Sequence, residues 1–290
     1  MDGIVIIDKP AGWTSQDVTA KLRGVLHTKR IGHGGTLDPM ATGVLPVFVG
    51  RATRGVEFFE QADKVYEAVL LLGVTTDTED TTGEILEKRP VSATKADILA
   101  VLPRFTGEIQ QIPPMYSAIK VNGRKLYDLA RKGQVVERKP RTVTIHSLDF
   151  LALDGNQVRL KIHCSKGTYI RTLCKDIGAA LGCGGCMAEL RRTRAGEYDQ
   201  AVAVSLETLI SAENPEIYLQ NVDTLFVNHP AVTLTAKQAL RCRNGNAFSI
   251  DLPEGTYRAY DEKGEFLMLA KVESGVMSTV KSFFAVYCHL

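Results

Sequence analysis

Residues 32–49 read GHGGTLDPMATGVLPVFV, and they place a single acid between a glycine-rich turn and a long apolar run. Gly34 and Gly35 permit tight or left-handed backbone geometry, and Pro39 disfavours the helical region for Asp38. The apolar residues from Val44 to Val49 predict a buried strand that anchors one side of the loop. A polar loop on a rigid support is a common way to present a catalytic carboxylate, although an acid that only caps a turn fits this stretch as well.

The composition is that of an ordinary globular protein and excludes few function classes. The chain has 290 residues, of which 44% are hydrophobic and 23% charged, enough for one large domain and a small one. Its net charge of +2 is too mild to identify a nucleic-acid partner. The first apolar run, Ile4 to Ile7, is too short for a signal peptide, and no run approaches the ~20 residues of a membrane span. We therefore expect a soluble cytoplasmic protein.

The six cysteines do not form a recognisable disulfide or metal framework. Without a secretory signal, reduced thiols are expected. The CGGC stretch from Cys183 to Cys186 has a spacing that suits zinc or redox chemistry, but a second CxxC pair is missing. We predict no metal site and interpret these cysteines as small buried residues.

The periodicity of apolar residues predicts a mixed α and β chain. Period-2 alternation puts Tyr66 on the core face of its strand, so it could be an ordinary core tyrosine. The expected elements are a strand at 3–8, a helix from an N-cap at about Ser15 to about Leu26, a strand at 64–73, a short strand near 84–88, a helix at 94–102, a hairpin of 141–153 with 157–164, and a helix from Ile170 to Leu181.

The chain becomes irregular between about residues 213 and 230, where we place a domain boundary. Beyond it, Thr235 with Gln238 forms a capping-box signature for a short helix, and short strands punctuated by glycine follow. The prediction is a large domain at residues 1–229 and a small, mostly β domain at 230–290.

Positive charge is concentrated in two segments. Between residues 117 and 142 there are eight basic and two acidic residues, and between 161 and 196 there are seven basic and two acidic ones. Tyr116, Tyr127 and Tyr169 are interleaved with them, which suits a polyanion that carries stackable bases. A solvated amphipathic helix face is the alternative.

Several motifs occur together in the order typical of one family. They are VIIDKPAGWTS, GHGGTLDPMATGVLP, KVYEA, TDTEDTTGE, IPPMYSAIKVNGRKLYDLARKG, HCSKGTYIRTLCKDIG and LRRTRAG. Over about residues 3–210 the chain resembles the TruB family of bacterial tRNA pseudouridine synthases, and the C-terminal module resembles the PUA-like RNA-binding domain of that family. The resemblance implies an α+β fold with a mixed, largely antiparallel sheet, and isomerisation of uridine 55 in the tRNA T loop to pseudouridine without a cofactor.

The resemblance also implies which side chains act. Asp38 matches the catalytic aspartate, and Arg171 matches an arginine that can keep this carboxylate ionised and aimed. Tyr66 matches a tyrosine that stacks on the target base and is a candidate for proton removal. Enzymes of this family flip the target uridine out of the T loop, because the base is inaccessible inside the folded loop. His33 matches the family histidine that intrudes into the T loop.

Four further residues match the family with less specific roles. Tyr169 and Leu190 match pocket-lining residues. Asp80 matches an aspartate of the active-site network, although an Asx turn is a competing interpretation. Lys9 matches a residue that supports the catalytic loop, or it is merely a lysine at the end of a strand.

The expected partner is tRNA. The basic insertion at about 112–142 would fold over the T stem-loop, the C-terminal domain would contact the acceptor stem, and the protein would be a monomer. The chain departs from its relatives at Gly184-Gly185-Cys186, where a histidine is common. An RNA chaperone without catalytic activity is the alternative function that uses the same basic surfaces.

Overall fold

One large sheet runs through most of the molecule. The computed structural model describes residues 1–121 and 123–284, so Cys288 and the last residues of the expected 230–290 domain lie outside the described residues. The strand order of this ten-stranded sheet is β14 (Val204–Ser205), β1 (Gly3–Lys9), β3 (Thr42–Val49), β12 (Gly185–Ala195), β4 (Lys64–Leu72), β11 (Gln157–Cys164), β10 (Arg141–Asp154) and β7 (Gly107–Gln111). In addition, β2 (Ile31–His33) pairs with β3, and β13 (Tyr198–Asp199) pairs with β12.

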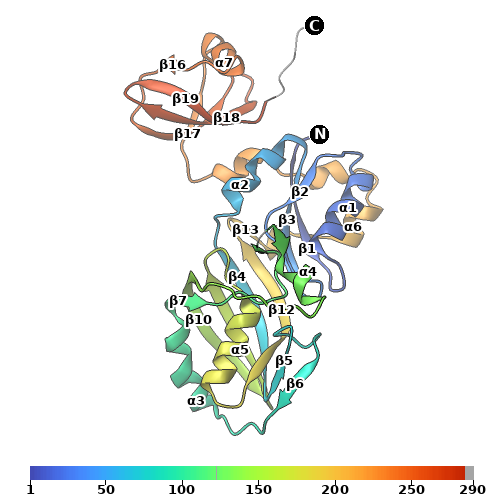
Figure 1. Ribbon diagram of the computed structural model, residues 1–290. Coiled ribbons are helices and arrows are strands. Elements are labelled where there is room, and N and C mark those ends of the chain that lie inside the picture. The colour runs from blue at the N-terminus through green and yellow to red at the C-terminus, as the bar shows by residue number, and fades with distance from the viewer. Residues whose placement is uncertain (122, 285–290) are drawn as a thin grey trace.

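The sheet is mixed and largely antiparallel, which confirms the expected fold class. Strand β1 runs parallel to β14, and β3 runs parallel to β12. The neighbouring pairs β1 with β3, β12 with β4, β4 with β11 and β11 with β10 are antiparallel. The parallel contact of β3 with β12 is short, covering only Arg191–Thr42 and Arg192–Gly43. This short contact joins the two lobes seen in Figure 1.

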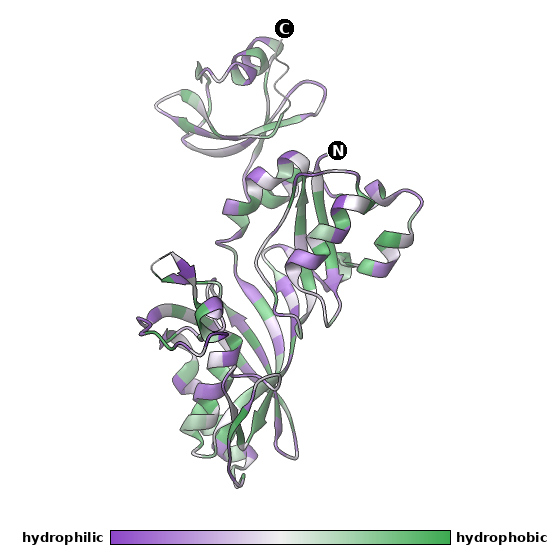
Figure 2. Cartoon of the chain, turned by 45° about the vertical axis from the view of Figure 1, so that its right-hand side comes forward, coloured by the Kyte–Doolittle hydropathy of each residue, from purple (hydrophilic) through white to green (hydrophobic). Residues whose placement is uncertain are grey.

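Helices cover the sheet and enclose its core. They are α1 (Ser15–Val25), α2 (Val56–Phe59), α3 (Lys95–Val101), α4 (Leu126–Ala130), α5 (Ile170–Ala180) and α6 (Leu206–Ser211). The core includes Leu22 of α1, Leu70 of β4 and Leu173 of α5, each fully buried. Figure 2 shows apolar colour along the strands of both lobes. Two short hairpins, β5 (Val74–Thr76) with β6 (Ile85–Lys88) and β8 (Lys120–Val121) with β9 (Arg124–Lys125), lie outside the main sheet.

Local sequence signals explain several of these elements. Helices α1 and α3 begin at capping boxes in which a threonine and an aspartate bond each other's backbone, Thr14 with Asp17 and Thr94 with Asp97. The expected N-cap at Ser15 was therefore wrong by one residue. Ser15 instead lies inside the helix, where its hydroxyl bonds Leu37. The hairpin of β10 and β11 is confirmed, with Asp154 opposite Gln157 at its turn.

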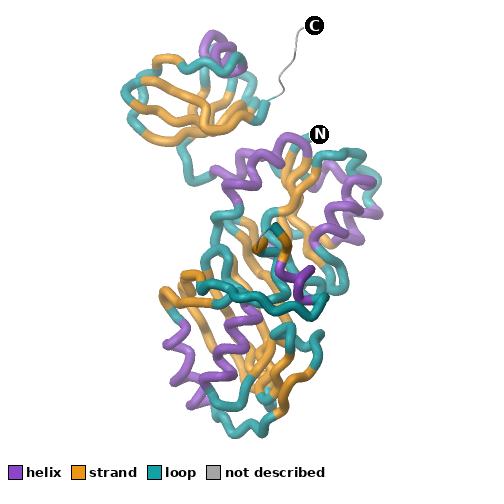
Figure 3. Tube along the Cα trace, in the orientation of Figure 1, coloured by secondary structure: helices purple, strands orange, loops and turns teal. Residues whose placement is uncertain are grey.

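A second sheet forms at the C-terminal end, separated from the first by the irregular segment. Its order is β15 (Ala231–Thr233), β17 (Gly255–Tyr260), β18 (Phe266–Glu273), β19 (Val276–Ser282) and β16 (Phe248–Ser249), with α7 (Ala236–Arg243) beside it. The Thr235–Gln238 capping box that begins α7 is confirmed. Figure 3 shows this sheet as a separate unit above the N-terminal lobe.

Aromatic packing ties the second sheet to the first lobe. Phe226 in the irregular segment contacts Phe58 of α2 at 5.4 Å between ring centroids and Phe283 at 5.8 Å. Phe283 and Leu269 belong to the same buried cluster as Phe48 of β3. Arg54 Nη1 also donates to the carbonyl of Ser282 at 3.1 Å. The two units therefore share an apolar contact rather than only a linker.

Candidate active site

The buried ammonium group of Lys9 contacts the loop that carries Asp38. This loop connects β2 to β3, and the ammonium group of Lys9 donates to the carbonyls of Pro10 at 2.9 Å, Trp13 at 2.7 Å and Pro39 at 3.3 Å. Lys9 is fully buried, and burial lowers its pKa to about 8 while nearby Asp38 opposes that shift. Lys9 is thus the last residue of β1, and its ammonium contacts the loop at Pro39, while a part of Lys9 in the reaction stays a prediction.

Arg192 is a second buried cation that binds the backbone at this loop, and the sequence did not single it out. Arg192 Nε donates to the carbonyl of Val44 at 2.7 Å, and its Nη2 donates to that of Gly35 at 3.1 Å. It is 1% exposed. A signal was present, because Leu190 and Arg192 are two residues apart on β12 and share its core face. The stretch AELRRTRAGEY at residues 188–198 predicts only a short strand, whereas β12 spans Gly185–Ala195.

The backbone of Arg192 also explains the glycine at position 43. A Cβ at Gly43 would lie 2.2 Å from the carbonyl oxygen of Arg192, and Gly43 has a φ of +99°. We expect Gly43→Ala to lower the free energy of unfolding by about 3 kcal/mol or more, since both strain and a backbone clash result. Thermal and urea unfolding measure this. The control is Gly155→Ala, where φ is +55° and nothing lies within 4 Å. Equal losses in the two variants would refute the close approach of β3 and β12.

The guanidinium of Arg171 contacts both oxygens of the Asp38 carboxylate. Arg171 lies in the first turn of α5, 6% exposed, and its Nε lies 3.0 Å from Asp38 Oδ2 while Nη2 lies 3.4 Å from Oδ1. The same guanidinium donates to the carbonyls of Thr78 at 3.1 Å and Tyr116 at 2.8 Å. The arginine is thus fixed by two loops far apart in sequence, and it orients the carboxylate.

Asp80 adds a second carboxylate to this network. Its Oδ1 accepts from the Thr78 hydroxyl at 2.8 Å and from the Thr82 amide at 2.9 Å, as in an Asx turn. Its Oδ2 lies 3.9 Å from Arg171 Nε. One carboxylate oxygen of Asp80 thus builds the Asx turn and the other faces Arg171, and a part of Asp80 in the reaction stays a prediction.

The charge state of Asp38 results from opposing effects. Burial raises the pKa of this carboxyl above its ordinary value of 3.8, Arg171 lowers it, and Asp80 raises it. The side chain of Asp38 is still 36% exposed, so a ligand can reach it. An accessible carboxylate beside a buried guanidinium is suited to attack or to stabilise an electron-poor carbon.

Tyr66 lies on β4, Leu190 lies on β12, and Tyr169 directly precedes α5. Tyr66 and Leu190 belong to the buried core of the sheet, with 9% and 8% exposure. Burial raises the pKa of Tyr66, opposed by the Arg192 guanidinium, so its hydroxyl is protonated near neutral pH. Tyr169 is the N-cap of α5. Its backbone N–H donates to Oε1 of the Gln111 side chain at 3.0 Å, and its carbonyl accepts from Nε2 of the same side chain at 3.2 Å. The burial of Tyr66 confirms the core position that the strand pattern predicts, and stacking on a target base stays a prediction.

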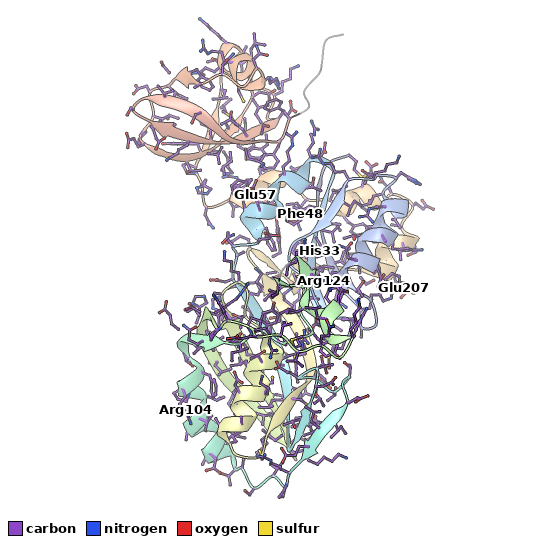
Figure 4. The ribbon with its side chains drawn as sticks, in the orientation of Figure 1. His33, Phe48, Glu57, Arg104, Arg124 and Glu207 are labelled. Atoms are coloured by element: carbon purple, nitrogen blue, oxygen red, sulfur yellow. The ribbon has the colours of Figure 1, made fainter. Side chains whose placement is uncertain are left out.

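His33 occupies the last position of β2, in the N-terminal lobe (Figure 4). Its Nδ1 is buried and has no hydrogen-bond partner among the described residues. Burial lowers the pKa of the ring, with a further contribution from Arg192. A neutral, half-buried ring with a free nitrogen can both pack against a base and accept or donate a hydrogen bond.

The basic insertion forms a groove of its own. Strands β8 and β9 with α4 enclose about 670 Å³ lined by Lys120, Gly123, Arg124, Asp128, Arg131 and Lys132. The insertion is connected to the site, because the carbonyl of Tyr116 accepts from Arg171 and the Tyr116 hydroxyl donates to Asp77 at 3.2 Å. Such a cationic surface beside a carboxylate site is suited to a polyanionic substrate.

The five cysteines in the described part of the chain are buried, as expected. Cys164, Cys174, Cys183, Cys186 and Cys242 are free thiols among the described residues. Burial raises the pKa of Cys186 to about 11, so this thiol is not poised for redox chemistry or metal binding. In the described part of the chain, no helix has both the length and the apolar character that crossing a membrane requires.

Comparison with known proteins gives consistent matches along the chain. Residues 23–170 match the TruB family pseudouridylate synthase (N terminal domain), and residues 171–222 match the tRNA pseudouridylate synthase B C-terminal domain. The chain is 47% identical over 282 residues to tRNA pseudouridine synthase B of Ectopseudomonas mendocina, covering 94% of this chain and 92% of the relative. It is 43% identical over 289 residues to the protein of the same name from Clostridium kluyveri, covering 98% and 100%.

Solved structures are similar over nearly the whole chain. The crystal structure of a Cbf5-Nop10-Gar1 complex contains a chain that is 27% identical, with a TM-score of 0.75, covering 98% of this chain and 85% of that one. The structure of an H/ACA RNP bound to a substrate RNA containing 2'-deoxyuridine gives a TM-score of 0.73 at 25% identity, covering 98% and 86%.

Proposed function

Because the chain belongs to the TruB family of pseudouridylate synthases, we propose that it isomerises uridine 55 in the T loop of tRNA. The chain is a tRNA pseudouridine synthase, an isomerase, and it has the expected pseudouridine synthase fold with a PUA-like C-terminal sheet. The observation that supports the proposed chemistry best is the 3.0 Å contact of Asp38 with Arg171, which joins the loop before β3 to α5.

We propose that Asp38 is the nucleophile. In the isomerisation the bond between N1 of uracil and C1′ of the ribose breaks, the base turns, and C5 bonds to C1′. The proton on C5 leaves, and N1 gains one, so no oxidant or cofactor is consumed. The Asp38 carboxylate would either bond covalently to the nucleoside or stabilise the electron-poor sugar after the base has left. Arg171 keeps that carboxylate ionised and directed at the pocket.

The neighbouring side chains would bind the base once it has left the RNA loop. Extracting a base costs a few kcal/mol, which contacts in the pocket must offset. We propose that His33 fills the gap in the T loop, since its half-buried ring has an unoccupied Nδ1. Tyr66 would stack on the uracil, with Tyr169 and Leu190 lining the pocket. Since burial raises the pKa of Tyr66, it would serve as a proton acceptor only if the bound substrate reverses this shift.

We propose that the RNA is gripped by two surfaces outside the catalytic pocket. The catalytic domain would comprise residues 1–229, with the insertion at about 112–142 closing over the T stem-loop. Residues 230–290 would form the domain that contacts the acceptor stem. A monomer satisfies this arrangement, and a tRNA substrate favours a cytoplasmic location.

The test of this function is to map pseudouridine in a tRNA transcript after incubation with the protein. We expect pseudouridine at position 55 and none in a matched transcript that carries cytidine 55. Pseudouridine elsewhere in both transcripts would contradict the proposed target. A protein that binds both transcripts and modifies neither would instead be an RNA chaperone, which the basic groove of the insertion would also support.

The acid limb of the pH profile follows from the charge state of Asp38. Its folded-state pKa is raised above 3.8, so the carboxylate needed for reaction is lost as pH falls through that raised value. We expect kcat/KM to decline on the acid side at a pH above 3.8, with a slope of one proton. Initial rates over a pH series, at constant ionic strength and with folding checked by circular dichroism, measure this. A profile flat down to pH 3.8 would contradict a catalytic Asp38 in this environment.

A further inference from the structure

Three metal-ligating side chains gather on the sheet, outside the residues assigned to catalysis. Asp63 Oδ2 lies 3.2 Å from His146 Nε2 and 3.9 Å from His163 Nε2. One ligand atom from each of the three residues lies within 4.8 Å of the others. Their side chains are partly exposed, between 30% and 44%, so an ion can enter from solvent.

The cluster is built by three separate parts of the chain. His163 lies on β11 on the face opposite to the buried Ile162 and Cys164, and β11 pairs with both β4 and β10. On β10 the register shifts between Ile145 and Ser147, so His146 is an extra, unpaired residue next to Ser147, the partner of His163. A β-bulge of this kind redirects a side chain. The two rings lie 4.7 Å apart between centroids, although 17 positions separate them in sequence.

Asp63 is fixed at the start of β4. Its carbonyl accepts a hydrogen bond from the Gly196 amide at 2.9 Å, which ties this turn to the end of β12. Two histidines and one carboxylate are therefore held by strands and a braced turn rather than by a free loop. The prediction of no metal site depended on the local spacing of cysteines and histidines, whereas the hairpin brings together residues that no local spacing reveals.

We propose that Asp63, His146 and His163 bind a divalent transition-metal ion, with Zn²⁺ as the best-suited ion. Zn²⁺ takes imidazole nitrogen and carboxylate oxygen at about 2.0–2.2 Å, so neighbouring ligand atoms in a tetrahedral site are about 3.3 Å apart. The carboxylate of Asp63 lies at 3.2 and 3.9 Å from the two histidine nitrogens, and all three ligand atoms lie within 4.8 Å of one another, so side-chain movements bring them to these distances. Three protein ligands leave one position for water, and nitrogen-rich ligand sets favour zinc over Mg²⁺ or Ca²⁺.

The charges around the cluster set its affinity. Arg194 Nη2 lies 3.4 Å from His163 Nε2, and metal binding must displace this contact. Lys64 follows Asp63 directly, but its ammonium is engaged by the carbonyls of Glu60 at 3.3 Å and Ala62. Arg194 is thus the cation that opposes the ion, and its removal strengthens binding.

The test is titration of the full chain with Co²⁺ and Zn²⁺, with bound metal measured by equilibrium dialysis and the cobalt complex by absorption. We expect one ion per chain, cobalt d–d bands, and no thiolate charge-transfer band, since every ligand is nitrogen or oxygen. Each of His146→Asn, His163→Asn and Asp63→Asn is expected to weaken binding at least about tenfold. Arg194→Gln is expected to strengthen it severalfold.

The matched control is His27→Asn. His27 is an exposed histidine with a φ of 45°, a conformation that asparagine tolerates, so this variant removes a histidine without disturbing the fold or the cluster. It is expected to bind the ion as the unaltered chain does, and Zn²⁺ is expected to raise the Tm of both but not of His163→Asn. Absence of stoichiometric binding, or binding unchanged in His163→Asn, would overturn the site. None of these readouts depends on pseudouridine formation.

Discussion

Asp38→Asn is expected to abolish pseudouridine formation and to leave tRNA binding nearly unchanged. The amide keeps the size of the side chain but cannot act as a nucleophile, so the rate falls by at least about 10⁴-fold. Phosphate contacts dominate RNA affinity, and Asp38 makes none of them in this account. Pseudouridine mapping and filter binding at two salt concentrations measure the two effects separately.

The melting temperature of Asp38→Asn distinguishes a catalytic role of Asp38 from a structural one. Because the folded-state pKa of Asp38 is raised, the ionised carboxylate costs stability at pH values above the folded pKa, and this cost disappears when the carboxyl is protonated. Asp38→Asn is thus expected to melt at the same temperature as the unaltered chain or above it near neutral pH. A variant that unfolds would show that Asp38 mainly holds the loop, as a turn-capping acid does.

Arg171→Met is expected to cause the second largest loss of pseudouridine formation. It removes the cation that faces Asp38 and leaves the carbonyls of Thr78 and Tyr116 without their donor. We expect kcat to fall by about 10²–10³-fold, because the carboxylate is no longer held ionised and aimed. The KM for tRNA should stay within about threefold, since Arg171 is 6% exposed and does not reach the RNA backbone in this account.

Two further arginine variants make this prediction specific. Arg171→Lys keeps the charge but cannot bond Asp38 and both carbonyls together, so it should recover only part of the activity. Arg191→Met is the matched control, because Arg191 forms an equally forked pair with a different acid, Asp8, at 3.0 Å through both terminal nitrogens. Equal losses in Arg171→Met and Arg191→Met would contradict a special role for the Asp38 contact.

Much of the fold was predictable because its signals are local. The apolar run of β3, the amphipathic pattern of α5 and the turn between β10 and β11 each depend on nearby residues, and all three form as expected. The one-residue error at Ser15 has a physical reason. Thr14 and Ser15 are both good caps, and the Ser15 hydroxyl is instead engaged by Leu37, which is distant in sequence.

The site was predictable in composition but not in geometry. The resemblance to the family identified Asp38 and Arg171, but their 3.0 Å contact spans 133 residues and depends on how the two lobes close. Arg192 is buried because β12 is long and because Gly43 approaches its backbone closely. The short strand predicted at residues 188–198 implies neither feature. The Asp63 cluster depends on a bulge, and a bulge leaves no periodic signal in one sequence.

The most direct test of the central claim is single-turnover tritium release from tRNA labelled at C5 of uridine 55, with the protein in excess so that binding does not limit the rate. The unaltered chain is predicted to release the label in step with pseudouridine formation, and Asp38→Asn, equally saturated with tRNA, is predicted to release none. Release by Asp38→Asn within about tenfold of the unaltered rate would show that the Asp38 carboxylate does not perform the reaction.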